Sequence, residues 1–167
     1  GMLVLKQFAE MRNKLEVLVD QRTEELKEKT LELEQQATHD KLTGLLNRRF
    51  ADDYLQREID NSHRQNREFT IALADIDHFK QINDLHSHAG GDAVLCRVAE
   101  ILTNRCRKTD VVARYGGEEF LLCFPDTNKD FAEQICSQIR SAIEKENWSS
   151  IARNIRITIS FGVAEVG

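Results

Sequence analysis

Acidic side chains gather at two places where apolar runs of the sequence end. Asp75 lies near the end of the apolar run 69–76, and Glu118 and Glu119 follow the glycine pair at 116–117. A carboxylate at the end of a strand is held by the sheet and still faces solvent, so it can bind a hard cation such as Mg²⁺ and share it with phosphates. If the two strands are neighbours, the three acids form a carboxylate cup of the kind that two-metal phosphoryl transfer requires.

The residues that follow the first run could bind phosphate directly. Backbone amides near His78 and Phe79 could receive phosphate oxygens, and Lys80 could supply a positive charge beside them. A charged loop between a strand and a helix explains the same residues equally well. The glycine pair predicts a hairpin turn with positive φ, and such turns are common. Each motif is therefore weak evidence by itself.

A third motif pairs Arg107 with Asp110, shortly before the glycine pair. An Arg and an Asp three residues apart can form a surface helix pair worth only about 0.2 to 0.5 kcal/mol. The same side chains can instead recognise a ligand. The guanidinium would then bind phosphate or a guanine edge, and the carboxylate would accept from guanine N1 and N2. The residues alone leave both interpretations open.

The elements that must position these residues follow from apolar periodicity. Helices are predicted over 47–59, from Asp92 at an N-cap onward, and after a capping-box pattern that opens with Thr127. Strands are predicted at 69–76, 111–115, 120–124 and 155–161. This order predicts an α+β domain with a mainly antiparallel sheet and helices on one side, of the ferredoxin-like or polymerase-palm kind.

The N-terminal segment differs from the rest of the chain. Residues 2–36 contain no Pro or Gly, and their charges alternate in sign, which predicts a long solvated helix. A heptad register with Leu26 at position a competes with one that places Leu18 at d, so the apolar stripe changes phase. We expect a parallel two-stranded coiled coil over 1–37 and a separate domain over 38–167. A single helix lying on the domain is the alternative.

Composition and charge exclude several classes of protein. The chain has 167 residues, 41% of them apolar, and a formal net charge of −5, which suits one domain with an appendage and disfavours binding to a nucleic acid polymer. No segment approaches the roughly 18 continuous apolar residues of a membrane span. The four cysteines lack the spacing of a zinc site, so we expect reduced thiols in a cytoplasmic protein or in the cytoplasmic part of a larger sensor.

Five short motifs occur in order along residues 38–167. They are 39–49, 75–84, Gly91-Asp92, 107–110 and 114–120. In this order and spacing they resemble the GGDEF family of bacterial diguanylate cyclases, and five together argue against coincidence. The resemblance implies that two GTP molecules are joined into cyclic di-GMP with release of two pyrophosphates.

The resemblance also implies a metal site and a catalytic set. Mg²⁺, with Mn²⁺ as an alternative, would be held by Asp75, the main-chain carbonyl of Ile76, Glu118 and Glu119. Glu118 would also act as the base for the attacking ribose 3′-hydroxyl. Glu119 and Lys80 complete the catalytic set, because a lysine can neutralise charge that develops on the phosphates.

Two further groups of residues are implied by the same resemblance. The substrate would be bound by His78, Phe79, Asn83, His88 and Asp92. Of these, Asn83 and Asp92 match the pair that recognises guanine, since a carboxylate that accepts from N1 and N2 rejects adenine. Arg107 and Asp110 match a product-inhibition site.

The implied product is two-fold symmetric, so two domains must face each other, each holding one GTP. A coiled coil would hold two copies of the chain at high effective concentration and could couple an upstream sensor to the geometry of the homodimer. The alternative function is a catalytically inactive receptor. It would bind cyclic di-GMP through Arg107 and Asp110, or it would bind GTP.

The chain departs from the family pattern at three places. His86-Ser87-His88 stands where the family often has an aromatic residue, Gly and His, on the guanine side of the site. Gln138 stands where some members place a second inhibitory Arg. Family members also continue with a helical segment beyond the last strand, so we expect the domain to be C-terminally incomplete.

Overall fold

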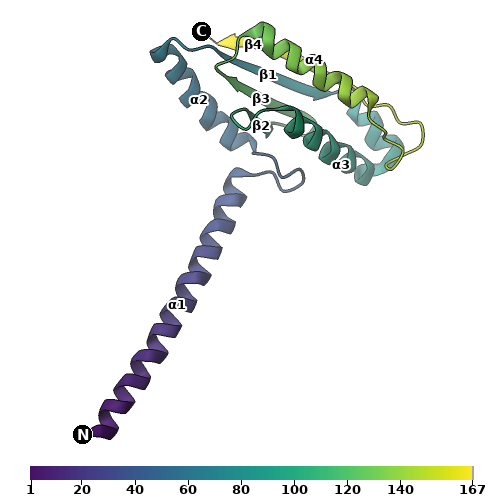
Figure 1. The fold of residues 1–167 in the computed structure, drawn as a ribbon. Coiled ribbons are helices and arrows are strands. Elements are labelled where there is room, and N and C mark those ends of the chain that lie inside the picture. The colour runs from purple at the N-terminus through teal and green to yellow at the C-terminus, as the bar shows by residue number, and fades with distance from the viewer. Residues whose placement is uncertain (167) are drawn as a thin grey trace. The chain divides into compact units, whose positions relative to one another are not determined.

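The chain divides into two compact units, Gly1–Ala37 and Thr38–Gly167, in the computed structural model, which describes residues 1–166. Helix α1 (Met2–Thr38) accounts for nearly all of the first unit (Figure 1). None of its residues is buried. The predicted long solvated helix is therefore confirmed. Across residues 1–166, none of the helices combines the length and apolarity needed to cross a bilayer.

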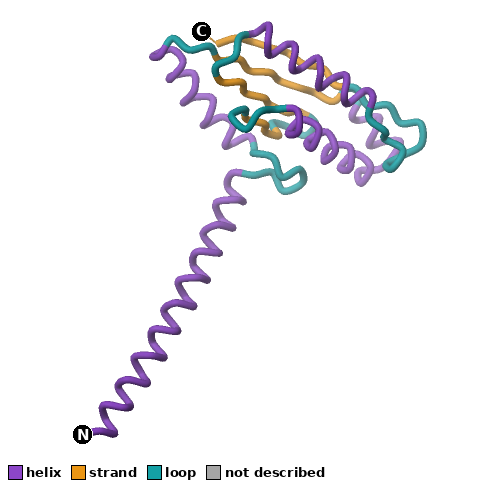
Figure 2. Tube along the Cα trace, viewed as in Figure 1, coloured by secondary structure: helices purple, strands orange, loops and turns teal. Residues whose placement is uncertain are grey.

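An antiparallel sheet organises the second unit. Within residues 38–166 it has four strands in the order β2-β3-β1-β4. The strands are drawn in orange in Figure 2. The strands are β1 (Phe69–Ile76), β2 (Val111–Arg114), β3 (Glu119–Pro125) and β4 (Ile159–Val166). Strand β1 pairs with β3 on one side and with β4 on the other, and every pairing is antiparallel. The predicted α+β architecture is confirmed.

Helices cover both faces of this sheet. Helices α3 (Phe79–Arg105) and α4 (Lys129–Lys145) form the larger core with alternate residues of β1 and β3, such as Ala74 and Phe120. Helix α2 (Arg48–Gln65) packs on the opposite face, where Ala51 and Leu121 belong to a second, smaller core. The expectation of helices on one side is therefore wrong. The apolar stripe of α2 shows that it packs on a sheet, but it does not show which face.

Helix α3 begins earlier than predicted. It starts at Phe79, directly after β1, and Asp92 lies in its interior rather than at an N-cap. The helix is interrupted at Ser87, whose φ of 66° and ψ of 169° are not helical. Its first half is largely polar, so it lacks the apolar periodicity on which the prediction depended.

Two other predicted boundaries also shift. Helix α4 is capped by Asn128, whose side chain accepts from the Phe131 amide at 2.9 Å, and not by Thr127. The last strand begins at Ile159, because β1 ends at Ile76, the residue that pairs with Ile159. Residues 155–158 alternate like a strand but have no ladder partner in β1. Alternation in a sequence cannot reveal where the partner strand stops.

Candidate active site

The carboxylate cup depends on the register between two neighbouring strands. Asp75 on β1 lies directly opposite Glu119 on β3. Directly opposed residues of antiparallel strands point to the same face of the sheet, so both side chains lie on the α2 face. The Ile76 amide donates to the Glu118 carbonyl at 3.2 Å and extends the pairing by one step. The three acids predicted to meet are therefore brought to one end of the central strands.

The raised pKa of Glu118 indicates that it lies close to the other two acids. Burial raises the pKa of Glu118, and the adjacent charges and hydrogen bonding of Asp75 raise it further, with a smaller contribution from Glu119. Neighbouring carboxylates repel one another when all are ionised. A cation between them would remove this repulsion.

The glycine turn lies close to the Glu119 carboxylate, a contact that the sequence did not predict. Among the described residues, Gly44 is the only glycine with positive φ, so the expectation of positive φ at 116–117 is wrong. A Cβ on Gly116 would instead come within 2.5 Å of a Glu119 carboxylate oxygen. The Glu119 side chain therefore folds back against the backbone of its own turn, and a side chain at position 116 would displace its carboxylate from this place.

Arg114 supports this turn, and sequence reasoning assigned it no role. Its guanidinium donates to the Gly117 carbonyl at 2.8 Å and to both carboxylate oxygens of Asp40 at 3.2 Å. Asp40 also accepts from the amide and hydroxyl of Thr43. Both residues lie within the motifs 39–49 and 114–120, but a pair separated by 74 residues leaves no local signal in the sequence.

The two aspartates of the Asp75-Ile76-Asp77 segment have different surroundings. One carboxylate oxygen of Asp77 accepts from the Thr158 hydroxyl at 2.7 Å, and the other accepts from the Ser160 hydroxyl at 2.6 Å. Both carboxylate oxygens of Asp77 therefore already accept hydrogen bonds, one from Thr158 just before β4 and one from Ser160 in β4. Asp75 faces the acids of β3 instead, which makes it the better metal ligand of the two.

The turn between β1 and α3 exposes a helix N-terminus beside the cup. His78 adopts a left-handed conformation with φ of 54° and ψ of 33°, and its side chain makes no capping hydrogen bond. The first amides of α3, including those of Phe79 and Lys80, have no partner within the helix. Such amides and the helix dipole favour an anion, so this turn fits the phosphate role predicted for it.

The predicted guanine pair lies on α3, one residue on each side of the interruption at Ser87. A Cβ on Gly91 would lie 1.8 Å from the Asn83 amide oxygen, so Gly91 lets the Asn83 side chain rest against the helix backbone just before Asp92. The structure thus brings Asn83 close to the Gly91-Asp92 motif. His88 is exposed, and among the described residues no hydrogen bond or ion pair links it to this pair.

Arg107 and Asp110 lie in the connection between α3 and β2, so the interpretation as a surface helix pair is wrong. The Arg107 amide donates to Asp110 at 2.8 Å, and its guanidinium donates to Asp110 at 3.2 Å and to the Thr127 hydroxyl at 2.7 Å. The Asp110 side chain is 0% exposed. This motif lies at the opposite end of β2 from the glycine turn, so it is separate from the cup.

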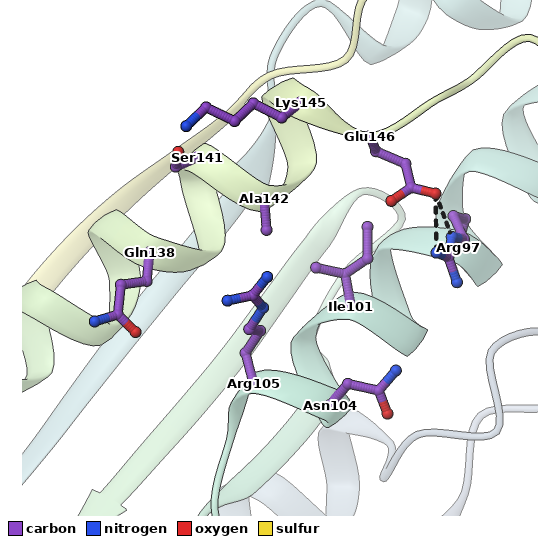
Figure 3. A pocket seen from close by; sticks show the side chains of 9 residues that line it. All are labelled: Arg97, Ile101, Asn104, Arg105, Gln138, Ser141, Ala142, Lys145 and Glu146. Carbon is purple, nitrogen blue, oxygen red and sulfur yellow. Dashed lines mark hydrogen bonds and ion pairs between the residues drawn. The ribbon is translucent and has the colours of Figure 1, made fainter.

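A hollow of about 570 Å³ lies between α3 and α4, away from the cup. Figure 3 shows the Arg105 guanidinium pointing into it between Gln138 and Ile101, while Arg97 is paired with Glu146. Gln138, the residue that the resemblance matched with a second inhibitory Arg, therefore lines this hollow.

The cup fits Mg²⁺ only in part. Within residues 1–166, no three His, Cys, Asp or Glu side chains converge closely enough to hold a metal ion by themselves. Mg²⁺ is seldom enclosed by protein alone, however; it usually keeps one or two carboxylates together with waters and substrate phosphates. Opposed Asp75 and Glu119, with a phosphate-binding helix start beside them, supply that smaller set of ligands.

Comparisons with known proteins agree with this fold. Residues 37–167 match the family described as "Diguanylate cyclase, GGDEF domain". Diguanylate cyclase DgcM of Escherichia coli K12 is 41% identical over 133 residues, which are 80% of this chain and 32% of that protein. Diguanylate cyclase DgcP of Pseudomonas aeruginosa PAO1 is 39% identical over 129 residues, 77% of this chain and 19% of that protein. The chain thus spans a third or less of the length of these relatives.

A solved structure extends the likeness to the N-terminal helix. The coiled coil and GGDEF domain of DgcB from Caulobacter crescentus, in complex with c-di-GMP, matches with a TM-score of 0.81 at 32% identity. The match covers 87% of this chain and 78% of that one. The chain therefore belongs to the GGDEF family, whose model covers the whole antiparallel domain.

Proposed function

We propose that residues 38–167 form a diguanylate cyclase domain that condenses two GTP molecules into cyclic di-GMP. The observation that carries the proposal is the placement of Asp75 opposite Glu119, with Glu118 beside them and the free N-terminus of α3 adjacent. Carboxylates next to an anion site suit a metal-bound triphosphate. The relatives named as diguanylate cyclases support the reaction class.

Mg²⁺, or Mn²⁺ in its place, would be held by Asp75, the Ile76 carbonyl and Glu119, with Glu118 within reach. When bound, the ion would neutralise the triphosphate and make the α-phosphorus more electrophilic. The cup itself would fix the ion at one end of the sheet, so that the phosphates extend toward the start of α3.

The remaining substrate contacts would come from α3. The amides of His78 and Phe79 would bind phosphate oxygens, and Lys80 would offset charge that develops on the leaving group. Asn83 and Asp92 would hold the guanine edge, with His88 near the same side. Both the phosphate and the base would thus be held by one helix, which fixes the distance between them.

Glu118 would accept the proton of the ribose 3′-hydroxyl. The 3′-oxygen of one GTP then attacks the α-phosphorus of the other, a new P–O bond forms, and the bond to the β-phosphate oxygen breaks so that pyrophosphate leaves with the electron pair. The same exchange in the opposite direction closes the ring and releases the second pyrophosphate.

One cup would hold one GTP, so the reaction requires two copies of the chain. We propose that residues 1–37 form a parallel coiled coil that joins them, and that an upstream sensor acts through it. Apolar side chains are exposed along α1, among them Leu15, Leu26 and Leu33. Pairing with a second helix would bury them, which supports the coiled coil.

Arg107 and Asp110 would bind the product cyclic di-GMP and inhibit the enzyme. Asp110 is buried and holds the Arg107 backbone and guanidinium, so the motif presents a fixed cation at the surface. The likeness to a solved domain in complex with c-di-GMP supports this assignment.

Mass spectrometry of the protein incubated with GTP and Mg²⁺ tests the proposal. We expect cyclic di-GMP from the wild-type chain and from Asp53→Asn, a control at an exposed aspartate, and none from Asp75→Asn or Glu118→Gln. Binding of cyclic di-GMP without any turnover in a dimeric sample would favour the receptor function instead.

A further inference from the structure

We infer that Asp77 is a positioning residue that holds the phosphate-binding turn against β4 through Thr158 and Ser160. This inference rests on the proposed function, because it concerns how the turn at His78 and Phe79 is prepared for a triphosphate. Asp77 belongs to the motif 75–84 but has no role in the proposed metal site, and Thr158 and Ser160 lie outside all five motifs.

Asp77 is fixed by three hydrogen bonds, two to Thr158, the residue before β4, and one to Ser160 within β4. Its amide donates to the Thr158 carbonyl at 3.0 Å. Its two carboxylate oxygens accept from the Thr158 hydroxyl at 2.7 Å and from the Ser160 hydroxyl at 2.6 Å. Hydroxyl bonds to an ionised carboxylate are shorter and stronger than neutral ones. The residue is therefore held in one orientation at the point where β1 ends.

The next residue explains why such an anchor is needed. His78 has φ of 54°, a left-handed conformation that is unfavourable for a residue with a side chain. Such a conformation persists only when neighbouring structure holds it. Asp77 holds one side of the turn, and on the other side the Phe79 side chain, 8% exposed, is packed in the larger core. Between these two anchors the amides of His78 and Phe79 have little freedom to turn away.

The hydroxyls also keep Asp77 from competing with Asp75. Both carboxylates lie at the same end of β1, and Ser160 is the residue of β4 that pairs with Asp75. A carboxylate whose oxygens both accept strong hydrogen bonds is a poorer ligand for a cation than one that faces other acids. Thr158 and Ser160 thus direct the metal toward Asp75 and Glu119.

Paired substitutions at the two hydroxyls separate positioning from folding. Thr158→Val and Ser160→Ala remove the donors, and Thr158→Ser and Ser160→Thr keep them as matched controls. Hydrogen exchange would report on the amides of residues 77–80 in the dimeric protein without ligand. Calorimetry with Mg²⁺ would compare a non-hydrolysable GTP analogue with guanosine, which lacks phosphates and contacts only the Asn83 and Asp92 side.

We expect the double variant Thr158→Val/Ser160→Ala to exchange these amides faster and to bind the GTP analogue about tenfold more weakly, with guanosine affinity unchanged. The two hydroxyl-keeping variants should behave like the wild type. Unchanged exchange and unchanged triphosphate affinity would overturn the inference, and so would an equal loss for analogue and guanosine. If the wild type bound neither compound, the proposed function would fail, while the exchange rates would still decide whether Asp77 holds the turn.

Discussion

Asp40 and Arg114 form a pair across 74 residues of sequence, with the Arg114 guanidinium donating to both Asp40 oxygens at 3.2 Å. Their side chains are only 21% and 18% exposed. The same guanidinium holds the Gly117 carbonyl. The loop before α2 and the glycine turn are therefore joined through one arginine.

Removing this pair should destabilise the domain in a pH-dependent way. Burial opposes ionisation of Asp40, but hydrogen bonds from Thr43 and the charge of Arg114 outweigh it and lower its pKa. Because the pKa of Asp40 is lower in the folded than in the unfolded state, its carboxylate stabilises the fold at pH values above its unfolded pKa. This contribution is lost as the pH falls through the folded pKa. We expect Asp40→Asn to cost about 1 to 2 kcal/mol near neutral pH.

Urea denaturation at several pH values measures this effect. The difference between wild type and Asp40→Asn should shrink as the pH falls below the ordinary aspartate pKa of 3.8. A difference that stays constant down to acid pH would show that Asp40 acts through packing rather than charge.

Glu119→Gln should have opposite effects on stability and on metal binding. In the absence of metal, Asp75 and Glu119 are like charges on directly opposed residues, and replacing one relieves about 0.2 to 1 kcal/mol of repulsion. Thermal denaturation should therefore show a higher Tm for the variant without Mg²⁺. Adding Mg²⁺ with a GTP analogue should raise the Tm of the wild type but not of Glu119→Gln. Equal Mg²⁺ effects on both proteins would contradict a metal at this position.

Glu118 should titrate above the ordinary glutamate pKa of 4.5 in the metal-free protein, because burial and Asp75 both raise it. Because its pKa is higher in the folded than in the unfolded state, Glu118 contributes stability at pH values below its unfolded pKa. This contribution is lost as the pH rises through the folded pKa. NMR titration of the side-chain carboxyl carbon would measure the value. Asp75→Asn should move it back toward 4.5, and so should Mg²⁺. No change in the Asp75 variant would mean that the two carboxylates are not neighbours in solution.

Ser87→Gly should stabilise the domain. Ser87 has φ of 66° and ψ of 169°, a region that is almost confined to glycine and costs another residue about 1 to 3 kcal/mol. Glycine loses more backbone entropy on folding, about 0.5 to 1 kcal/mol, so a net gain of about 1 kcal/mol remains. Chemical denaturation would measure the gain. Ser87→Ala keeps a Cβ and should give none; a gain of equal size in both variants would point to the lost hydroxyl instead.

Helix α1 should make the chain a dimer. Its apolar side chains are exposed in a single copy, among them Leu26 at 66% and Leu33 at 62%. Sedimentation equilibrium should show a dimer for the full chain and a monomer for residues 38–167. Leu26→Asp should shift the full chain toward monomer, whereas Lys27→Asp, at a neighbouring position, should have less effect. A full chain that stays monomeric at high concentration, with GTP analogue and Mg²⁺, would exclude coupling through a coiled coil.

Much of the local structure could be predicted from the sequence. The run 69–76 became β1 with the same bounds, and Asn47 caps α2 at the start of the predicted helix. The acids of the cup were identified from their place at strand ends. These predictions succeed because apolar periodicity and the place of a residue at the end of a strand are properties of a few neighbouring residues.

Other features depend on contacts between distant segments. Only the register of β1 with β3 places Asp75 opposite Glu119. Only the packing of Thr158 and Ser160 against the end of β1 gives their hydroxyl hydrogen bonds to Asp77 rather than to Asp75. The face covered by α2 and the close approach of Glu119 to Gly116 are likewise decided by packing. The sequence by itself determined which elements form and which residue types can bind metal and phosphate. The tertiary structure decided which of those residues meet, because strand register and side-chain partners are set by segments far apart in the chain.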